Sequence, residues 1–151
     1  MNPMTLTRRT ALAAIASALV ARNAFATPEQ TKEWLAAAAA QGSKGGTPKE
    51  GKVTLKAPEI AENGNAVPIT VSVESEMTDK SYVKAIYIAA DGNPNPGVAT
   101  YEFTPLSGKA EVQLRVRLAQ TQKLVVVAEM NDGALYTVSR EIKVTIGGCG
   151  G

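Results

Sequence analysis

The residue best placed to do chemistry in this sequence is a single cysteine close to its end. Cys149 lies within Gly147-Gly148-Cys149-Gly150-Gly151, the last five of 151 residues, and the chain has no other cysteine. Lone cysteines are usually buried and inert. Here, however, four glycines supply no side chains to pack, and their backbone entropy opposes ordering. We therefore expect an exposed thiol with a dedicated role on a flexible C-terminal arm.

The surroundings of this thiol indicate a carrier and not a catalyst. A catalytic thiolate is stabilised by His, Lys, Arg or a helix N-terminus, and no such group lies near Cys149 in the sequence. Five extended residues span roughly 16 Å, and a strip without bulky side chains could enter a narrow channel in another protein. We predict that a substrate is attached covalently to Cys149 and that partner enzymes activate the sulfur, so the chain itself is not an enzyme.

The composition excludes several other kinds of site. One Cys and no His rule out a Cys/His zinc site, a c-type haem attachment, an iron–sulfur cluster and a His-based triad, so we predict no metal and no cofactor. A lone cysteine can form a disulfide only with another molecule. Three of the 16 basic residues and none of the 14 acidic residues fall in residues 1–26. The remaining net charge of −1 makes nucleic-acid binding an unfavoured function.

The N-terminus has the features of an export signal. Arg8 and Arg9 precede an Ala-rich apolar stretch, which ends in the signal-peptidase pattern Ala24-Phe25-Ala26. Adjacent arginines are typical of the twin-arginine pathway, although an ordinary secretory signal is the alternative. The apolar stretch, residues 11–21, would rise only about 16 Å as a helix, too short to cross a bilayer. We expect residues 1–26 to be removed and the mature chain to reside in the periplasm, not in the membrane.

Residues 27–51 are predicted to form a helix and a loop. Thr27 can cap the helix, Pro28 suits its first position, and Gln30 can complete a capping box. The helix should continue to Gln41, where Gly42 can end it. Its apolar face is thin, which predicts packing against the domain or against a partner.

From Lys52 onwards the hydrophobic period changes to two, which is typical of half-buried strands. Turn residues separate the apolar runs, and Asp132-Gly133 predicts a tight hairpin. Seven short strands without intervening helices favour an all-β fold, an immunoglobulin-like antiparallel β-sandwich over residues 52–146, followed by the arm at 147–151. The predicted strands cover residues 53–57, 67–73, 83–90, 98–103, 112–118, 124–130 and 136–146.

Three features together resemble the SoxY family, the sulfur-carrier subunits of the bacterial Sox thiosulfate-oxidising system. They are the Gly-Gly-Cys-Gly-Gly terminus, the twin-arginine leader, and the segment from Lys56 to Gly64 that leads into Val67-Pro68-Ile69-Thr70-Val71. The resemblance implies a heterodimer with SoxZ, a second immunoglobulin-like protein. It also implies that the metals and haems belong to partner enzymes.

The resemblance further implies a sequence of sulfur intermediates on Cys149. The c-type cytochrome SoxXA would join thiosulfate to the thiol as an S-thiosulfonate. The dimanganese hydrolase SoxB would then release sulfate and leave a persulfide. The sulfane dehydrogenase SoxCD, where present, would oxidise the remaining sulfur, or another acceptor would take it. A further hydrolysis would restore Cys149.

Two other functions and one local question stay open at this point. The chain could be a structural or adhesive module whose Cys149 crosslinks a homodimer, or, least favoured, a thiol enzyme. We interpret Asn63-Gly64 as a turn and Pro68 as an edge-strand residue, although this segment could also help to dock SoxZ.

Overall fold

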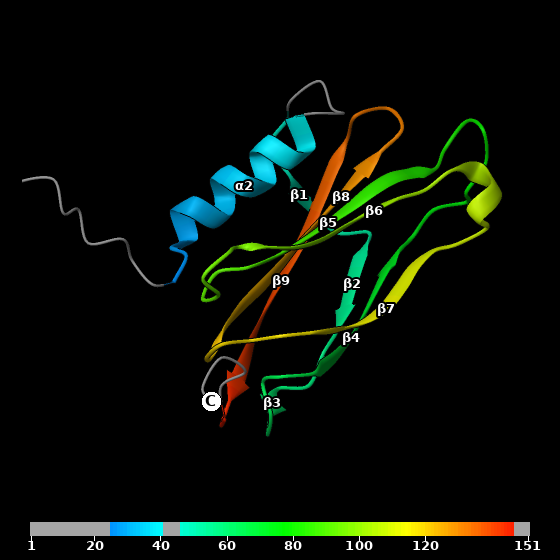
Figure 1. Ribbon diagram of the computed structural model, residues 1–151. Helices are drawn as coiled ribbons and strands as arrows, with labels where there is room; N and C mark the ends of the chain where they lie inside the picture. Colours follow the sequence, from blue (N-terminus) through cyan, green and yellow to red (C-terminus); the bar gives the residue numbers. More distant parts are fainter. Residues whose placement is uncertain (1–24, 41–45, 147–151) are drawn as a thin grey trace, which may run out of the picture.

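The computed structural model describes residues 25–40 and 46–146, which form two packed β-sheets and one α-helix (Figure 1). This confirms the predicted immunoglobulin-like sandwich. In the large sheet the strand order is β1-β9-β8-β5-β6, with β3 also paired to β9, and in the small sheet it is β2-β4-β7. The large sheet contains β1 (Lys49–Glu50), β3 (Ile60–Ala61), β5 (Val83–Ala90), β6 (Gly97–Glu102), β8 (Gln122–Met130) and β9 (Leu135–Val144). The small sheet contains β2 (Val53–Lys56), β4 (Val67–Val73) and β7 (Ala110–Val116).

The core lies between the two sheets and follows from the alternation in the sequence. In β4, every second residue from Val67 to Val73 is buried, whereas Pro68 is exposed. Ile86, Ile88 and Leu124, on the central strands of the large sheet, have no exposed surface. Strands β5 and β8 are more continuously buried than β4, because a helix covers their outer face.

That helix is α2 (Pro28–Ala40), and it begins as the sequence predicts. The Thr27 amide donates to Gln30 Oε1 at 2.9 Å, and the Gln30 amide donates to Thr27 Oγ1 at 3.3 Å. Its buried side chains, including Leu35 and Ala39, pack against a second apolar cluster on β5, β8 and β9, which confirms packing against the domain. Its predicted C-terminal residues 41 and 42 lie outside the described residues. No helix in the described ranges is long and apolar enough to cross a membrane.

All seven predicted strands are present, with ends that differ by a few residues. The predicted hairpin joins β8 to β9, where Gly133 has a φ of 89° and donates its amide to the Met130 carbonyl at 2.9 Å. The structure adds β1 and β3, both parallel to β9. Two-residue strands are too short to produce a hydrophobic period, so the sequence did not predict them. A 3-10 turn, η1 (Pro105–Ser107), lies in the connection from β6 to β7.

Of the two predictions made for Asn63-Gly64 and Pro68, the structure confirms the first and contradicts the second. Asn63-Gly64 does lie in a turn, in which the Asn65 amide donates to Asn63 Oδ1 at 2.9 Å. The prediction that Pro68 belongs to an edge strand is wrong, because β4 is the middle strand of the small sheet. Proline is nevertheless accommodated, since the pairing of β2 with β4 stops at Thr70 and leaves that flank of Pro68 without a strand partner.

Candidate functional site

The functional residues predicted from the sequence all lie outside the described residues. These are Arg8 and Arg9 of the signal, and Gly147, Gly148, Cys149, Gly150 and Gly151 of the arm. What the structure describes is the base from which the arm continues, namely the end of β9 with Thr145 and Ile146. The geometry of this base decides how firmly the arm is attached to the sandwich.

Residues 59–64 run alongside the end of β9 and hold it by backbone hydrogen bonds. Strand β3 pairs in parallel with β9, with Ile60 opposite Lys143. The Lys143 amide donates to the Glu59 carbonyl at 2.9 Å. Two residues on, the Thr145 amide donates to the Ala61 carbonyl at 3.1 Å. The segment that carries the sequence resemblance therefore forms a third strand against the final strand.

The last described carbonyl is also fixed. The Gly64 amide donates to the Ile146 carbonyl at 2.8 Å, and the Gly64 carbonyl accepts from the amide of buried Leu118 at 2.8 Å. Gly64 is itself buried. The turn at Asn63-Gly64 thus links the end of β9 to the connection between β7 and β8, in addition to reversing the chain.

Two threonine hydroxyls complete this attachment. The Val144 amide donates to Thr121 Oγ1 at 2.9 Å, and the Thr145 hydroxyl donates to the Glu62 carbonyl at 3.0 Å. Residues 143–146 are consequently bonded from two sides. We call residues 59–64, Thr121 and residues 143–146 the arm base.

The side chains around the arm base offer little electrostatic activation. Arg140 Nη2 lies 3.7 Å from Glu59 Oε1, with side-chain exposures of 38% and 87%, and an exposed pair at this distance contributes little. Two aliphatic side chains are exposed here, Ile60 at 57% and Ile146 at 65%. The arm base can therefore anchor and present the chain that follows it. It places no acid or base in a defined catalytic geometry.

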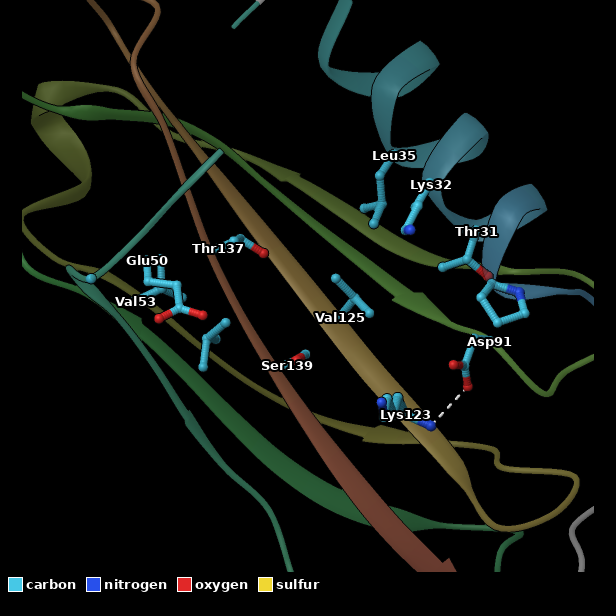
Figure 2. Close-up of a pocket in the computed structure, with 13 residues that line it drawn as sticks. Thr31, Lys32, Leu35, Glu50, Val53, Asp91, Lys123, Val125, Thr137 and Ser139 are labelled. Carbon is cyan, nitrogen blue, oxygen red and sulfur yellow. Dashed lines mark hydrogen bonds between the residues drawn. The ribbon is translucent and has the colours of Figure 1, made fainter. Parts of the chain in front are cut away.

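A separate groove of about 670 Å³ lies between α2, the turn from β1 to β2, and strands β8 and β9 (Figure 2). Its polar lining includes Lys32 and Glu50, together with Asp91, whose Oδ1 accepts from the Lys123 amide at 2.8 Å. No residue of the arm base lines it. Within residues 25–40 and 46–146, no group of three or more His, Cys, Asp or Glu side chains is placed to hold a metal ion.

The structure also contains a buried polar cluster that the sequence reading did not identify. Glu129 has no exposed surface, and its carboxylate accepts from the Tyr87 hydroxyl at 2.8 Å and from Lys84 Nζ at 3.0 Å. Burial, and then the hydrogen bond to Glu129, raise the pKa of Tyr87 above its ordinary value. A signal was available, because Glu129 interrupts the apolar run of β8 and a buried acid requires partners. The Tyr87 ring of this cluster packs against Leu35 and its neighbours on the outer face of the large sheet, which α2 covers.

Comparison with known proteins relates the chain to one family. A family model described as sulfur oxidation protein SoxY matches residues 37–149, a range that ends at Cys149. The solved structure of the sulfur carrier protein SoxY from Chlorobium limicola f thiosulfatophilum is 39% identical, with a TM-score of 0.60. That match covers 76% of this chain and 98% of that chain. No curated protein sequence matches.

Other solved structures are similar in fold alone. A superoxide reductase (neelaredoxin) from Ignicoccus hospitalis is 19% identical, with a TM-score of 0.52, and the match covers 80% of this chain and 94% of that chain. A putative superoxide reductase from Thermotoga maritima is 22% identical, with a TM-score of 0.53 and coverages of 70% and 96%. These matches show a shared fold and carry no functional assignment.

Proposed function

The chain belongs to the SoxY family of sulfur carrier proteins, and we propose that it carries sulfur covalently on Cys149 during thiosulfate oxidation in the periplasm. The observation that carries this proposal is the arm base. A strand held from two sides leads directly into Gly147-Gly148-Cys149-Gly150-Gly151, which contains the one thiol of the chain.

The position of the arm base sets the distance over which the thiol can act. Cys149 follows Ile146 by three residues, and three extended residues span at most roughly 11 Å. A partner enzyme must therefore approach the end of β9 to within about that distance. Because glycines flank the thiol on both sides, the arm can pass through an opening too narrow for larger side chains.

The proposed chemistry begins with an oxidation and a hydrolysis on the sulfur of Cys149. Its thiol and thiosulfate form a sulfur–sulfur bond, giving the S-thiosulfonate, one proton and two electrons, which the c-type cytochrome SoxXA accepts. Water then attacks the terminal sulfone, releasing sulfate and two protons and leaving a persulfide. The dimanganese enzyme SoxB performs this hydrolysis.

The persulfide is then cleared from the carrier. The sulfane dehydrogenase SoxCD oxidises its outer sulfur to a sulfonate by accepting six electrons, while three water molecules supply the oxygens and six protons are released. A second hydrolysis releases sulfate and restores the thiol. Where SoxCD is missing, another acceptor takes the sulfane sulfur and the same thiol is regenerated.

We further propose that the carrier is exported by the twin-arginine pathway and works as a heterodimer with SoxZ. Cleavage after Ala26 would leave the helix cap intact, because both of its partners, Thr27 and Gln30, remain in the mature chain. An oxidising compartment also permits a Cys149-linked homodimer. Such a dimer would hold the thiol in a form that cannot accept sulfur.

Intact mass spectrometry of the protein from native periplasm tests the proposal. During thiosulfate oxidation, we expect the mass of a chain that starts at Thr27 and carries reductant-labile sulfur or thiosulfonate. The Cys149→Ser variant should carry neither modification. An unmodified thiol, or only a Cys149-linked dimer, under active oxidation would instead support the structural module.

Two glycine substitutions, one in the arm and one outside it, test whether the arm enters partner enzymes. Gly148→Val should slow loading of Cys149 while partner binding persists. The matched variant Gly46→Val should load normally, because no other group lies within 4 Å of a Cβ at Gly46. Equal loading rates for the two variants would show that the arm glycines do not serve channel entry.

A further inference from the structure

Strand β7 (Ala110–Val116) is an open edge of the small sheet. It pairs with β4 along all seven of its residues, and no strand in the described part of the chain pairs with its other flank. An open edge presents a row of backbone N–H and C=O groups that another strand can bind. Figure 1 shows β7 beside β4 in the small sheet.

The two faces of β7 differ in a regular way. Glu111, Gln113 and Arg115 are exposed on the outer face. On the inner face Val112 and Leu114 are only partly buried, although they pack against the core. The strand therefore has an unpaired backbone and two half-covered apolar side chains on the same edge.

The charges of β7 are complementary to a second copy of the same strand. In an antiparallel pair centred on Gln113, Glu111 of each copy lies opposite Arg115 of the other. The same register places Val112 of each copy opposite Leu114 of the other. Opposite charges and apolar pairs that face each other across strands are stabilising, and both kinds recur twice because the arrangement has two-fold symmetry.

Charged residues on an edge ordinarily keep strands apart. That repulsion requires like charges to lie opposite each other. Just beyond the two ends of β7, Lys109 of one copy would lie opposite Arg117 of the other, so like charges meet there. Inside the strand the meeting charges are opposite. The pattern therefore favours pairing over the seven residues of β7 and opposes its extension.

We propose that two copies of this chain associate through antiparallel pairing of their β7 strands. The pairing joins the two small sheets into one sheet of order β2-β4-β7-β7-β4-β2, with the two-fold axis at Gln113. Because a single seven-residue edge is small beside ordinary interfaces of about 1,600 Å², the dimer is reversible and depends on concentration. It is distinct from a Cys149-linked dimer and does not require the thiol.

Reversing the charges of Glu111 and Arg115, singly and together, tests this proposal. Sedimentation equilibrium would be measured on the full chain carrying Cys149→Ser, which removes disulfide-linked dimers. Glu111→Arg or Arg115→Glu should each weaken dimerisation at least about tenfold, since each creates two like-charge pairs. The double variant should restore it. Lys56→Glu, an exposed change on the opposite edge of the same sheet, should have no effect.

Two results of this experiment would overturn the proposal. One is a parent chain that stays monomeric at every concentration at which the protein remains soluble. The other is a double variant that dimerises no better than the two single variants. At a concentration at which the parent is monomeric, all four altered chains should retain the parent melting temperature, because the substituted side chains are exposed.

Disulfide trapping tests the register independently. Opposed residues of antiparallel strands have Cα atoms about 4.5–5.5 Å apart, within the range of a disulfide. In the Cys149→Ser background, Gln113→Cys should give a disulfide-linked dimer under mild oxidation. The control Thr54→Cys, exposed on β2, should not. If SoxZ is co-expressed and Gln113→Cys crosslinks only to SoxZ, the edge binds that partner and the proposed homodimer is wrong.

Discussion

Replacing Tyr87 by Phe removes one hydroxyl and leaves the ring in place. In the folded chain this hydroxyl donates to a carboxylate oxygen of Glu129 at 2.8 Å, and Glu129 is fully buried. Lys84 Nζ contacts the other oxygen at 3.0 Å. After the substitution, one oxygen of a fully buried carboxylate loses this hydrogen bond.

The size of the effect follows from these contacts. A hydrogen bond to a charged group contributes about 1.5–3 kcal/mol, and the substitution removes one such bond without creating a large cavity. We expect the free energy of unfolding to fall by about 2 kcal/mol. For the roughly 115 residues that the structure describes, that change lowers Tm by about 8 °C.

Urea and thermal unfolding followed by circular dichroism measure this change. Tyr101→Phe is the matched control, because Tyr101 is half-buried on the neighbouring strand β6 and its hydroxyl has no hydrogen bond within the described part of the chain. The control should stay within about 0.5 kcal/mol of the parent. If Tyr87→Phe were as mild as the control, the hydroxyl would contribute nothing to holding the buried carboxylate.

Three further predictions concern pH, packing and the arm base. Because burial and the adjacent carboxylate raise the pKa of Tyr87, its stabilisation is complete below about pH 10 and is lost as the pH rises further; urea unfolding up to about pH 11 should show a steeper decline for the parent than for Tyr87→Phe. A Cβ at Gly97 would lie 2.5 Å from the indole ring of Trp34 in α2, whereas a Cβ at Gly46 would meet nothing within 4 Å. Gly97→Ala should therefore cost about 1–3 kcal/mol and Gly46→Ala almost nothing, and equal melting temperatures would contradict this packing. Thr121→Val removes the acceptor of the Val144 amide, so hydrogen exchange at that amide should quicken about fivefold, while unchanged exchange would show that the hydroxyl does not hold β9.

The long strands and the start of the helix could be predicted because their determinants are local. Alternation from Val67 to Val73 marks β4, and Thr27 with Gln30 marks the start of α2. In each case the residues that specify the element are neighbours in the sequence. A reader of the sequence can therefore recognise the pattern without knowing what packs against it.

The arm base could not be predicted in the same way. Its hydrogen bonds join residues 59–64 to residues 143–146, and no period or composition links segments so far apart. Pro68 shows the same limit, because its tolerance in a middle strand depends on where β2 stops. For the candidate site, the sequence identified the type and spacing of the arm residues, whereas only the fold identified what anchors them.

The neighbours of β9 have a mechanical consequence for the proposed entry of the arm into partner enzymes. Strand β9 pairs antiparallel with β8 over eight residues, and in parallel with β1 at its start and with β3 at its end. Tension applied beyond Ile146 acts along the strand axis, whereas the antiparallel hydrogen bonds run across it. Such a pull shears many bonds together and does not peel them apart one at a time. The sandwich is thus built to withstand traction at the end where partner enzymes would grip it.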